Sequence, residues 1–342
     1  MQILKILLQL IELLKMLINS TEDIQTVLSV NITLDYSNIR NHLKTCENRY
    51  IKPLLGDSLY SELDTIHNDA GLTPTTEQAE LTRLCQTSMA YLALHKFIPY
   101  AEVNIGDGGI RRLENDKNKT AHKNQIVNLR EASLEDGFSA IEDAIIYIED
   151  NISEFSSWPY QDNHQYFINT ATEFNKFVFI DESRLLFLQL LPRMEEVETR
   201  LENNISSDFF NELKSKIQNA DTTPISADDL LAIKKCQTFI AHEVFARSVR
   251  FLPFIFKNGQ LTVFNNVFHL DYRPTQQTSA DIISNFKATL EISANSALEQ
   301  LMKFLHEFAD NYPTFKASTA YVEDRGISPR FENTENHKTF FA

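Results

Sequence analysis

The sequence repeats itself after about 150 residues, and this internal repeat constrains the fold more than any single motif does. The segment RYIKPLLGDSLYSEL at 49–63 aligns with TRLENNISSDFFNEL at 199–213, and both segments end in Glu-Leu. Further matches follow in the same order, and their offset grows from 150 to 157, as short loop insertions would cause. These matches pair INS at 18–20 with INT at 168–170, TP at 73–74 with TP at 223–224, FIPY at 97–100 with FLPF at 251–254, and AIEDAIIYI at 140–148 with ALEQLMKFL at 297–305. We therefore predict a tandem duplication, with one unit over residues 19–165 and a second, divergent copy over residues 166–316.

The fold class of both units is predicted to be mainly α. Glycine accounts for only 8 of the 342 residues, whereas folds built from sheets use glycine at many turns and bulges. The expected helices of the first unit cover 36–51, 57–68, 76–98 and 126–152, and the last helix of the second unit covers 280–311. Each copy is therefore expected to be a helical, adaptor-like unit.

The long central helix of each unit has recognisable ends. Thr75 and Gln78 have the spacing of a capping box, and Pro99 is expected to end the helix that they begin, because proline cannot continue one. Ser226 and Asp229 are expected to open the corresponding helix of the second unit.

A projecting β-hairpin is predicted after the central helix of each unit. The first surrounds the glycine-rich turn at 106–109, and the second surrounds Asn258-Gly259, a dipeptide typical of two-residue hairpin turns. Between Gly106 and Arg130 the chain has six basic and three acidic residues, although its net charge is −15. This stretch is either an exposed loop or a surface that contacts an acidic neighbour, such as the next subunit of a homo-oligomer. The candidate contact residues are Ile105, Gly106, Arg111, Arg112, Lys117, Lys119, Asn258, Gly259, Phe340 and Phe341.

The two ends of the chain are expected to lie outside the repeat. Residues 1–18 are predicted to form an N-terminal amphipathic helix, since the apolar run at 3–18 is too short to span a membrane and its polar residues fall on one stripe. Such a helix would pack on its own domain or on a neighbouring subunit, or lie on a membrane surface. The polar residues 317–342 are predicted to form an extended C-terminal arm, which is disordered or becomes ordered against a partner.

No local motif predicts catalysis or metal binding. His242-Glu243 begins like a zinc-protease helix, but the second histidine four residues later is missing. The acidic cluster of Glu195, Glu196 and Glu198 is expected on a solvated helix face. We therefore expect no enzyme activity, no catalytic residue, no metal and no cofactor.

Charge and cysteine content exclude two further classes of protein. A net charge of −15 argues against wrapping nucleic acid, because neutralising phosphates requires a surplus of Lys and Arg. Cys46, Cys85 and Cys236 are odd in number and far apart, so they predict neither a disulfide framework nor a metal site, and they favour a reducing compartment.

Two stretches of the first unit resemble a known family. The run YIKPLLG at 50–56, followed by Leu59-Tyr60 and Glu62-Leu63, is similar to head–tail connector proteins of tailed phages that infect Bacteroides-type bacteria. So is the later run from IPY at 98–100 to VNIG at 103–106 and a basic strand. This family comprises adaptor, head-completion and ring proteins, including the ring proteins of crAss-like phages. The resemblance covers 20–160 and is weaker over the second unit.

The resemblance implies a structural virion protein without enzymatic activity. About twelve copies would form a ring below the portal and join capsid to tail around the DNA channel. The implied partners are further copies of the chain, the portal protein and other connector or tail ring proteins, with no membrane partner. Genomic DNA would pass through the ring without sequence-specific binding, and an acidic channel wall would repel its phosphates. The protein would be made in the host bacterial cytoplasm and end in the head–tail connector region of the virion.

Two other functions stay open from the residues alone. One is a helical adaptor or scaffold that binds a defined partner through its hairpins without assembling on itself. The other is an enzyme whose site forms between the two repeats, which would require a pocket with convergent carboxylates or histidines.

Overall fold

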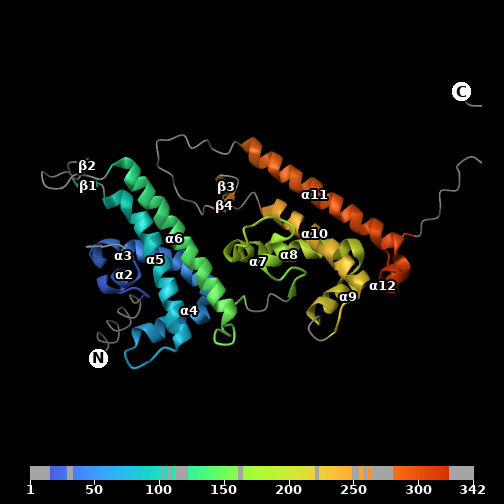
Figure 1. The fold of residues 1–342 in the computed structure, drawn as a ribbon, viewed down its shortest axis with the longest axis horizontal. Helices are drawn as coiled ribbons and strands as arrows, with labels where there is room; N and C mark the ends of the chain where they lie inside the picture. The colour runs from blue at the N-terminus through green and yellow to red at the C-terminus, as the bar shows by residue number, and fades with distance from the viewer. Residues whose placement is uncertain are drawn as a thin grey trace, which may run out of the picture. The chain divides into compact units, whose positions relative to one another are not determined.

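The chain is mainly α-helical and divides into two compact units, as the ribbon in Figure 1 shows. The computed structural model describes residues 16–28, 34–101, 103–106, 109–112, 122–160, 165–219, 223–248, 254–257, 260–263 and 280–322. The first unit comprises Met1–Asp162 with Ser183–Leu185, and the second comprises Asn163–Glu182 with Leu186–Ala342. The mainly α fold predicted from the sequence is therefore confirmed.

The first unit is built around two long antiparallel helices, α5 and α6, which lie side by side (Figure 1). Gly137 allows this close approach, because a Cβ atom there would lie 2.7 Å from Cγ of Leu92. Its described elements are α2 Thr21–Val27, α3 Tyr36–Cys46, a π-helical turn η1 Glu47–Ile51, α4 Lys52–Asn68, α5 Thr76–Ala101, β1 Val103–Gly106, β2 Gly109–Arg112 and α6 Lys123–Asp150.

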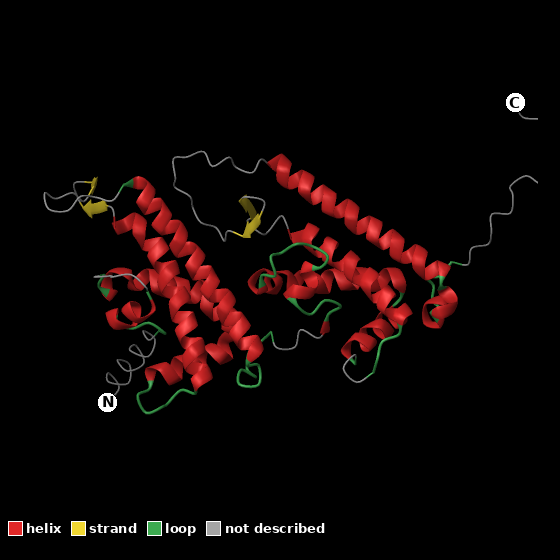
Figure 2. Cartoon of the chain, viewed as in Figure 1, coloured by secondary structure: helices red, strands yellow, loops and turns green. Residues whose placement is uncertain are grey.

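The second unit has the same order of main elements, with α10 and α11 as its long helix pair. Its described elements are α7 Ala171–Asn175, α8 Arg184–Ile205, α9 Ser207–Gln218, α10 Ala227–Ser248, β3 Phe254–Lys257, β4 Gln260–Val263, α11 Ala280–Glu307, a 3₁₀ turn η3 Ala309–Asn311 and α12 Pro313–Lys316. In both units two short strands lie between the long helices in sequence, as the cartoon colouring of Figure 2 shows.

Both strand pairs are antiparallel and are joined by two residues. In the first pair Gly106 lies opposite Gly109, and in the second Lys257 lies opposite Gln260. Asn258 and Gly259, which the sequence places at the second turn, lie outside the described residues.

Both predicted helix starts are confirmed. The Thr75 hydroxyl accepts a hydrogen bond from the Gln78 backbone N–H at 3.1 Å, and the Gln78 side chain accepts one from the Thr75 backbone N–H at 3.0 Å. At the start of α10 the Asp229 backbone N–H donates to the Ser226 hydroxyl at 3.1 Å. The expected helix end at Pro99 is wrong, because α5 continues to Ala101. A proline this close to a helix end removes little of the hydrogen-bond ladder.

Buried aromatic side chains pack in each unit just after the C-terminal end of its last long helix, α6 or α11. In the first unit the buried Trp158 donates from Nε1 to the backbone oxygen of Leu54 at 2.9 Å. In the second unit the Phe209 ring packs against the rings of Tyr312 and Phe315, with centroids 5.4 Å and 5.7 Å away. The sequence alignment pairs Trp158 with Phe315, and both side chains are buried.

The predicted terminal segments fall largely outside the described residues. For the N-terminal helix expected over 1–18, only residues 16–18 are described, and they are buried and not helical. For the C-terminal arm expected over 317–342, residues 317–322 are described. Tyr321 in this stretch stacks on the His306 ring of α11, with the centroids 5.4 Å apart.

Candidate interaction surfaces

Leu17, four positions before the start of α2, is held by side chains from the π-helical turn η1 and from α5. The Leu17 backbone N–H donates to Oε1 of Glu47 at 3.0 Å, and the Leu17 backbone oxygen accepts from Nε2 of Gln86 at 2.6 Å. The Glu47 residue is only 1% exposed. We call Leu17, Glu47 and Gln86 the first anchor. The first anchor binds both the backbone N–H and the backbone oxygen of Leu17, so it fixes the position of the chain just before α2.

The second unit contains the same arrangement. The Phe167 backbone N–H donates to Oε1 of Glu198 at 2.6 Å, and the Phe167 oxygen accepts from Nε2 of Gln237 at 2.7 Å. Glu198 is 3% exposed. We call Phe167, Glu198 and Gln237 the second anchor; its members lie 150, 151 and 151 positions after those of the first anchor.

The turn that follows each anchored residue is also repeated. Met16 N donates to the Asn19 side chain at 3.2 Å, and Tyr166 N donates to the Asn169 side chain at 3.2 Å. The helix caps correspond as well, since the Ser20 hydroxyl caps α2 and the Thr170 hydroxyl caps α7. One pattern of hydrogen bonds is thus built twice from residues that lie 150 or 151 positions apart.

The two anchors neutralise their buried carboxylates differently. Burial raises the pKa of both Glu47 and Glu198 above the usual range. Hydrogen bonding from the Tyr60 hydroxyl and the positive charge of Lys52 oppose this rise in the pKa of Glu47. For Glu198 the opposing group is Lys214, whose Nζ lies 2.7 Å from Oε2. The expectation of a solvated face is therefore wrong for Glu198, although Glu195 and Glu196 are exposed.

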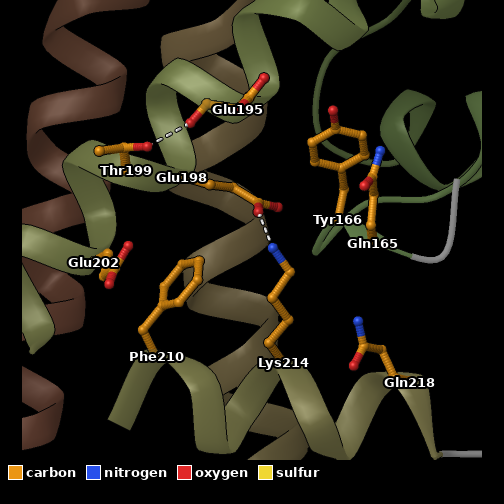
Figure 3. A pocket seen from close by; sticks show the side chains of 9 residues that line it. All are labelled: Gln165, Tyr166, Glu195, Glu198, Thr199, Glu202, Phe210, Lys214 and Gln218. Carbon is orange, nitrogen blue, oxygen red and sulfur yellow. Dashed lines mark hydrogen bonds and ion pairs between the residues drawn. The ribbon is translucent and has the colours of Figure 1, made fainter. Parts of the chain in front are cut away.

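A pocket of about 380 Å³ opens beside the second anchor (Figure 3). Glu198 and Lys214 face each other inside it, and the Lys214 ammonium lies 5.2 Å from the centroid of the Phe210 ring. The lining residues are Gln165, Tyr166, Glu195, Glu198, Thr199, Glu202, Phe210, Lys214 and Gln218. Three carboxylates and one ammonium line the pocket, so its charge favours a cationic group.

The zinc-protease-like pair in α10 takes part in helix packing. Nδ1 of His242 lies 2.8 Å from the Thr238 backbone oxygen. The buried Glu243 carboxylate pairs with Arg247 at 2.8 Å and with Arg200 of α8. No group of three His, Cys, Asp or Glu side chains able to hold a metal occurs in the part of the chain that the structure describes.

The predicted contact residues are described only in the first hairpin. Ile105 and Gly106 lie in β1, and Arg111 and Arg112 lie in β2, where Arg111 pairs with Asn104. The other predicted contact residues lie outside the described residues: Lys117, Lys119, Asn258, Gly259, Phe340 and Phe341.

Sequence reasoning missed the anchors. The sequence pattern that could have revealed the anchors is a glutamine among the apolar residues of the central helix. It recurs in the second unit about one repeat length later. Gln86 follows the buried Cys85, and Gln237 follows the buried Cys236. The large majority of buried polar side chains have a hydrogen-bond partner. Gln86 is partly buried and Gln237 is buried, so this recurrence indicates a shared structural role.

The comparisons with known proteins agree with a repeated unit. A family of unknown function, DUF6712, matches the chain twice, at residues 51–168 and 201–325. No curated protein and no solved structure matches the chain. Among the described helices, none is both long and apolar enough to cross a membrane. Because the two matches together cover more than half of the sequence, the chain belongs to the DUF6712 family.

Proposed function

We propose that this protein is a structural virion subunit, a head–tail connector that forms a ring below the portal around the DNA channel. The resemblance of the YIKPLLG run at 50–56 and the VNIG strand at 103–106 to connector proteins motivates the proposal. The observation that supports it most is that the two units of one chain contain matching anchors. Most soluble oligomers are closed, symmetric assemblies of identical chains, and matching anchors in both units would let each chain present two related surfaces to its neighbours.

The proposal includes a tandem duplication of the unit. The anchors support it, because matched side chains hold matched backbone atoms at offsets of 150 and 151. The two family matches begin 150 residues apart and end 157 residues apart, which is the growth in offset seen in the sequence. A chance resemblance between two helical bundles would not reproduce individual hydrogen bonds.

The strand pairs are proposed as the projecting contact elements of each copy. Each pair follows the central helix of its unit, and Arg111 and Arg112 place two positive charges on β2 of a strongly acidic chain. Attraction between such a basic element and an acidic neighbouring copy would guide assembly.

The proposal is tested by measuring assembly directly. Native mass spectrometry of the purified full chain should show a closed oligomer of defined copy number, and negative-stain images of virions should show a ring at the portal vertex. A strictly monomeric protein that is absent from purified particles would overturn the proposal. A monomer that binds one defined partner would support the adaptor alternative.

A further inference from the structure

The surface around the first anchor has charges opposite to those around the second. Glu195 and Glu202 flank Glu198 in α8, and Lys44 and Lys52 occupy the corresponding positions on either side of Glu47. We call these the acidic face and the basic face.

A third charged position is reversed in the same way. Lys214, which pairs with Glu198, corresponds to Asp64 in the first unit. The two faces thus share one backbone arrangement, and the sign of the charge is inverted at all three flanking positions. The flanking positions of the two faces therefore carry charges of opposite sign, so the two faces attract each other.

The flanking residues are available to a partner. Lys44 and Glu195 are exposed, and Lys52 and Glu202 are partly exposed. Among the described residues, Glu195 and Glu202 have no ionic partner, and both line the pocket beside the second anchor. That pocket also presents the aromatic rings of Tyr166 and Phe210, against which the stem and ammonium of a lysine pack favourably.

We propose that the basic face of one copy docks on the acidic face of the next copy. This inference rests on the proposed ring function, and it identifies the contact that builds the ring. Because the two faces are different surfaces of one chain, the contact is heterologous, and heterologous contacts generate closed rings when the rotation between copies closes. Opposite charge then sets both the partner and the direction of assembly.

The test uses two charge variants of the full chain. Glu195→Lys/Glu202→Lys makes both faces basic, and Lys44→Glu/Lys52→Gln removes the positive charge of the basic face. Glutamine is chosen at position 52 because Nζ of Lys52 lies 4.7 Å from the Tyr60 ring centroid, and a neutral side chain avoids placing a second carboxylate beside that ring and Glu47. Each variant alone should need at least about tenfold more protein for half-maximal assembly, measured by sedimentation velocity.

Mixing the two variants supplies the decisive measurement. In an equimolar mixture, the unchanged basic face of one variant meets the unchanged acidic face of the other, and the two altered faces are also complementary. Assembly should therefore return to the wild-type concentration range, in oligomers that contain both variants.

Matched controls separate this contact from a general effect of charge. Glu135→Lys/Glu154→Lys and Lys234→Glu/Lys303→Gln make the same chemical changes at exposed positions elsewhere. Both controls should assemble like the wild type, and circular dichroism should show a folded, helical protein for all four variants.

The outcomes separate this inference from the proposed function. Wild-type assembly of either face variant, or a mixture that stays unassembled, overturns the docking of these faces while leaving the ring in place. A wild-type chain that never assembles overturns both.

Discussion

Glu47 and Glu198 each place a carboxylate where almost no water reaches. Burying a charge is costly unless hydrogen bonds and opposite charges compensate it. Each carboxylate accepts a backbone N–H from the residue that enters its unit, and that N–H would otherwise be buried without a partner. The glutamate side chain thus both positions and stabilises the segment that precedes the first helix of its unit.

The first prediction concerns the first anchor. Glu47→Ala leaves the Leu17 N–H without its acceptor and should lower the free energy of unfolding by about 1–3 kcal/mol. Glu47→Gln keeps an oxygen acceptor and should cost less. Urea denaturation at pH 7.5 measures both variants, and equal losses would show that the hydrogen bond is unimportant.

The pH dependence of the same site gives a second prediction. Burial raises the pKa of Glu47 in the folded protein above its ordinary value of 4.5. The folded state therefore holds this proton more tightly than the unfolded state, and the resulting stability is present below pH 4.5 and lost as the pH rises through the folded-state pKa. The advantage of the wild type over Glu47→Gln should consequently be larger at pH 4.5 than at pH 7.5. A constant difference across this range would contradict the raised pKa.

One backbone conformation recurs at the junction of two helices in each unit. Gly56 has φ 73° and ψ 163°, and Ser206, 150 positions later, has φ 78° and ψ 147°. Glycine adopts this region readily, whereas a serine there is strained. The Ser206 hydroxyl is also buried without a hydrogen-bond partner among the described residues. The second unit therefore has a strained serine where the first has glycine.

The third prediction exchanges these two residues. Ser206→Gly should raise the free energy of unfolding by about 1 kcal/mol, because it relieves the strain and removes the unpartnered hydroxyl. Gly56→Ser should lower it by about 2 kcal/mol or more, since a Cβ atom there would lie 2.8 Å from Cγ of Pro159. Thermal melts of both variants provide the measurement, and shifts of the same sign would contradict the explanation.

At the scale of elements, the π-helical turn at Glu47–Ile51 marks a one-residue difference between the units. Glu47 corresponds to Glu198 at an offset of 151, whereas Ile51 corresponds to Leu201 at an offset of 150. The first unit has one additional residue in this interval, and the wider turn accommodates it within a continuous helix. The α8 helix of the second unit is regular over the same stretch.

The fourth prediction follows from this additional residue. Deleting the exposed Asn48 should convert the turn to regular α-helix and change the free energy of unfolding by no more than about 2 kcal/mol. Deleting the exposed Thr199 from α8 should cost more than about 4 kcal/mol, because it rotates the later apolar residues away from the core. Urea denaturation measures the free energy of unfolding of both deletion variants. Similar decreases in the two would contradict the view that the first unit contains one inserted residue in the π-helical turn.

The elements that sequence reasoning predicted well are those with local signals. The caps at Thr75 and Ser226 depend on residues three positions away, and both predicted starts were correct. The break expected between 51 and 57 is shorter than predicted, because α4 begins at Lys52 and is interrupted only by the non-helical Gly56, where it kinks. Proline is tolerated at the first positions of a helix, so Pro53 does not mark a gap.

The interaction surfaces were less predictable, because their residues meet only after folding. Glu198 looked like part of a solvated acidic cluster, yet it bonds to Phe167 and Lys214, which lie 31 and 16 positions away. A periodic pattern shows which face of a helix is buried, but it does not show which buried position contains a paired charge. The alignment at an offset of 150 pairs Glu47 with Val197, and only the hydrogen bonds of the folded chain pair Glu47 with Glu198.

At the scale of the whole molecule, the C-terminal boundary of the second unit lies beyond residue 316. Tyr321 stacks on His306 and packs edge-on to Phe315, with the Phe315 and Tyr321 centroids 6.0 Å apart. The first six residues of the predicted arm therefore belong to the folded unit.

The fifth prediction separates folding from assembly at this end. Deleting 323–342 should leave the melting temperature within about 2 °C of the wild type and weaken assembly. Deleting 317–342 should also lower the melting temperature, because it removes the Tyr321 contacts. Unchanged assembly after the shorter deletion would show that the arm is not a contact element.

The anchors also determine how each unit carries a mechanical load. Both the N–H and the carbonyl of Leu17 are held, by side chains 30 and 69 positions later, and Phe167 is held in the same way. A pull on the chain ahead of either unit is thus shared between two helices and does not unravel the chain one residue at a time. The force needed to extract this segment is set by hydrogen bonds that break together, a property that would suit the ring subunit proposed above.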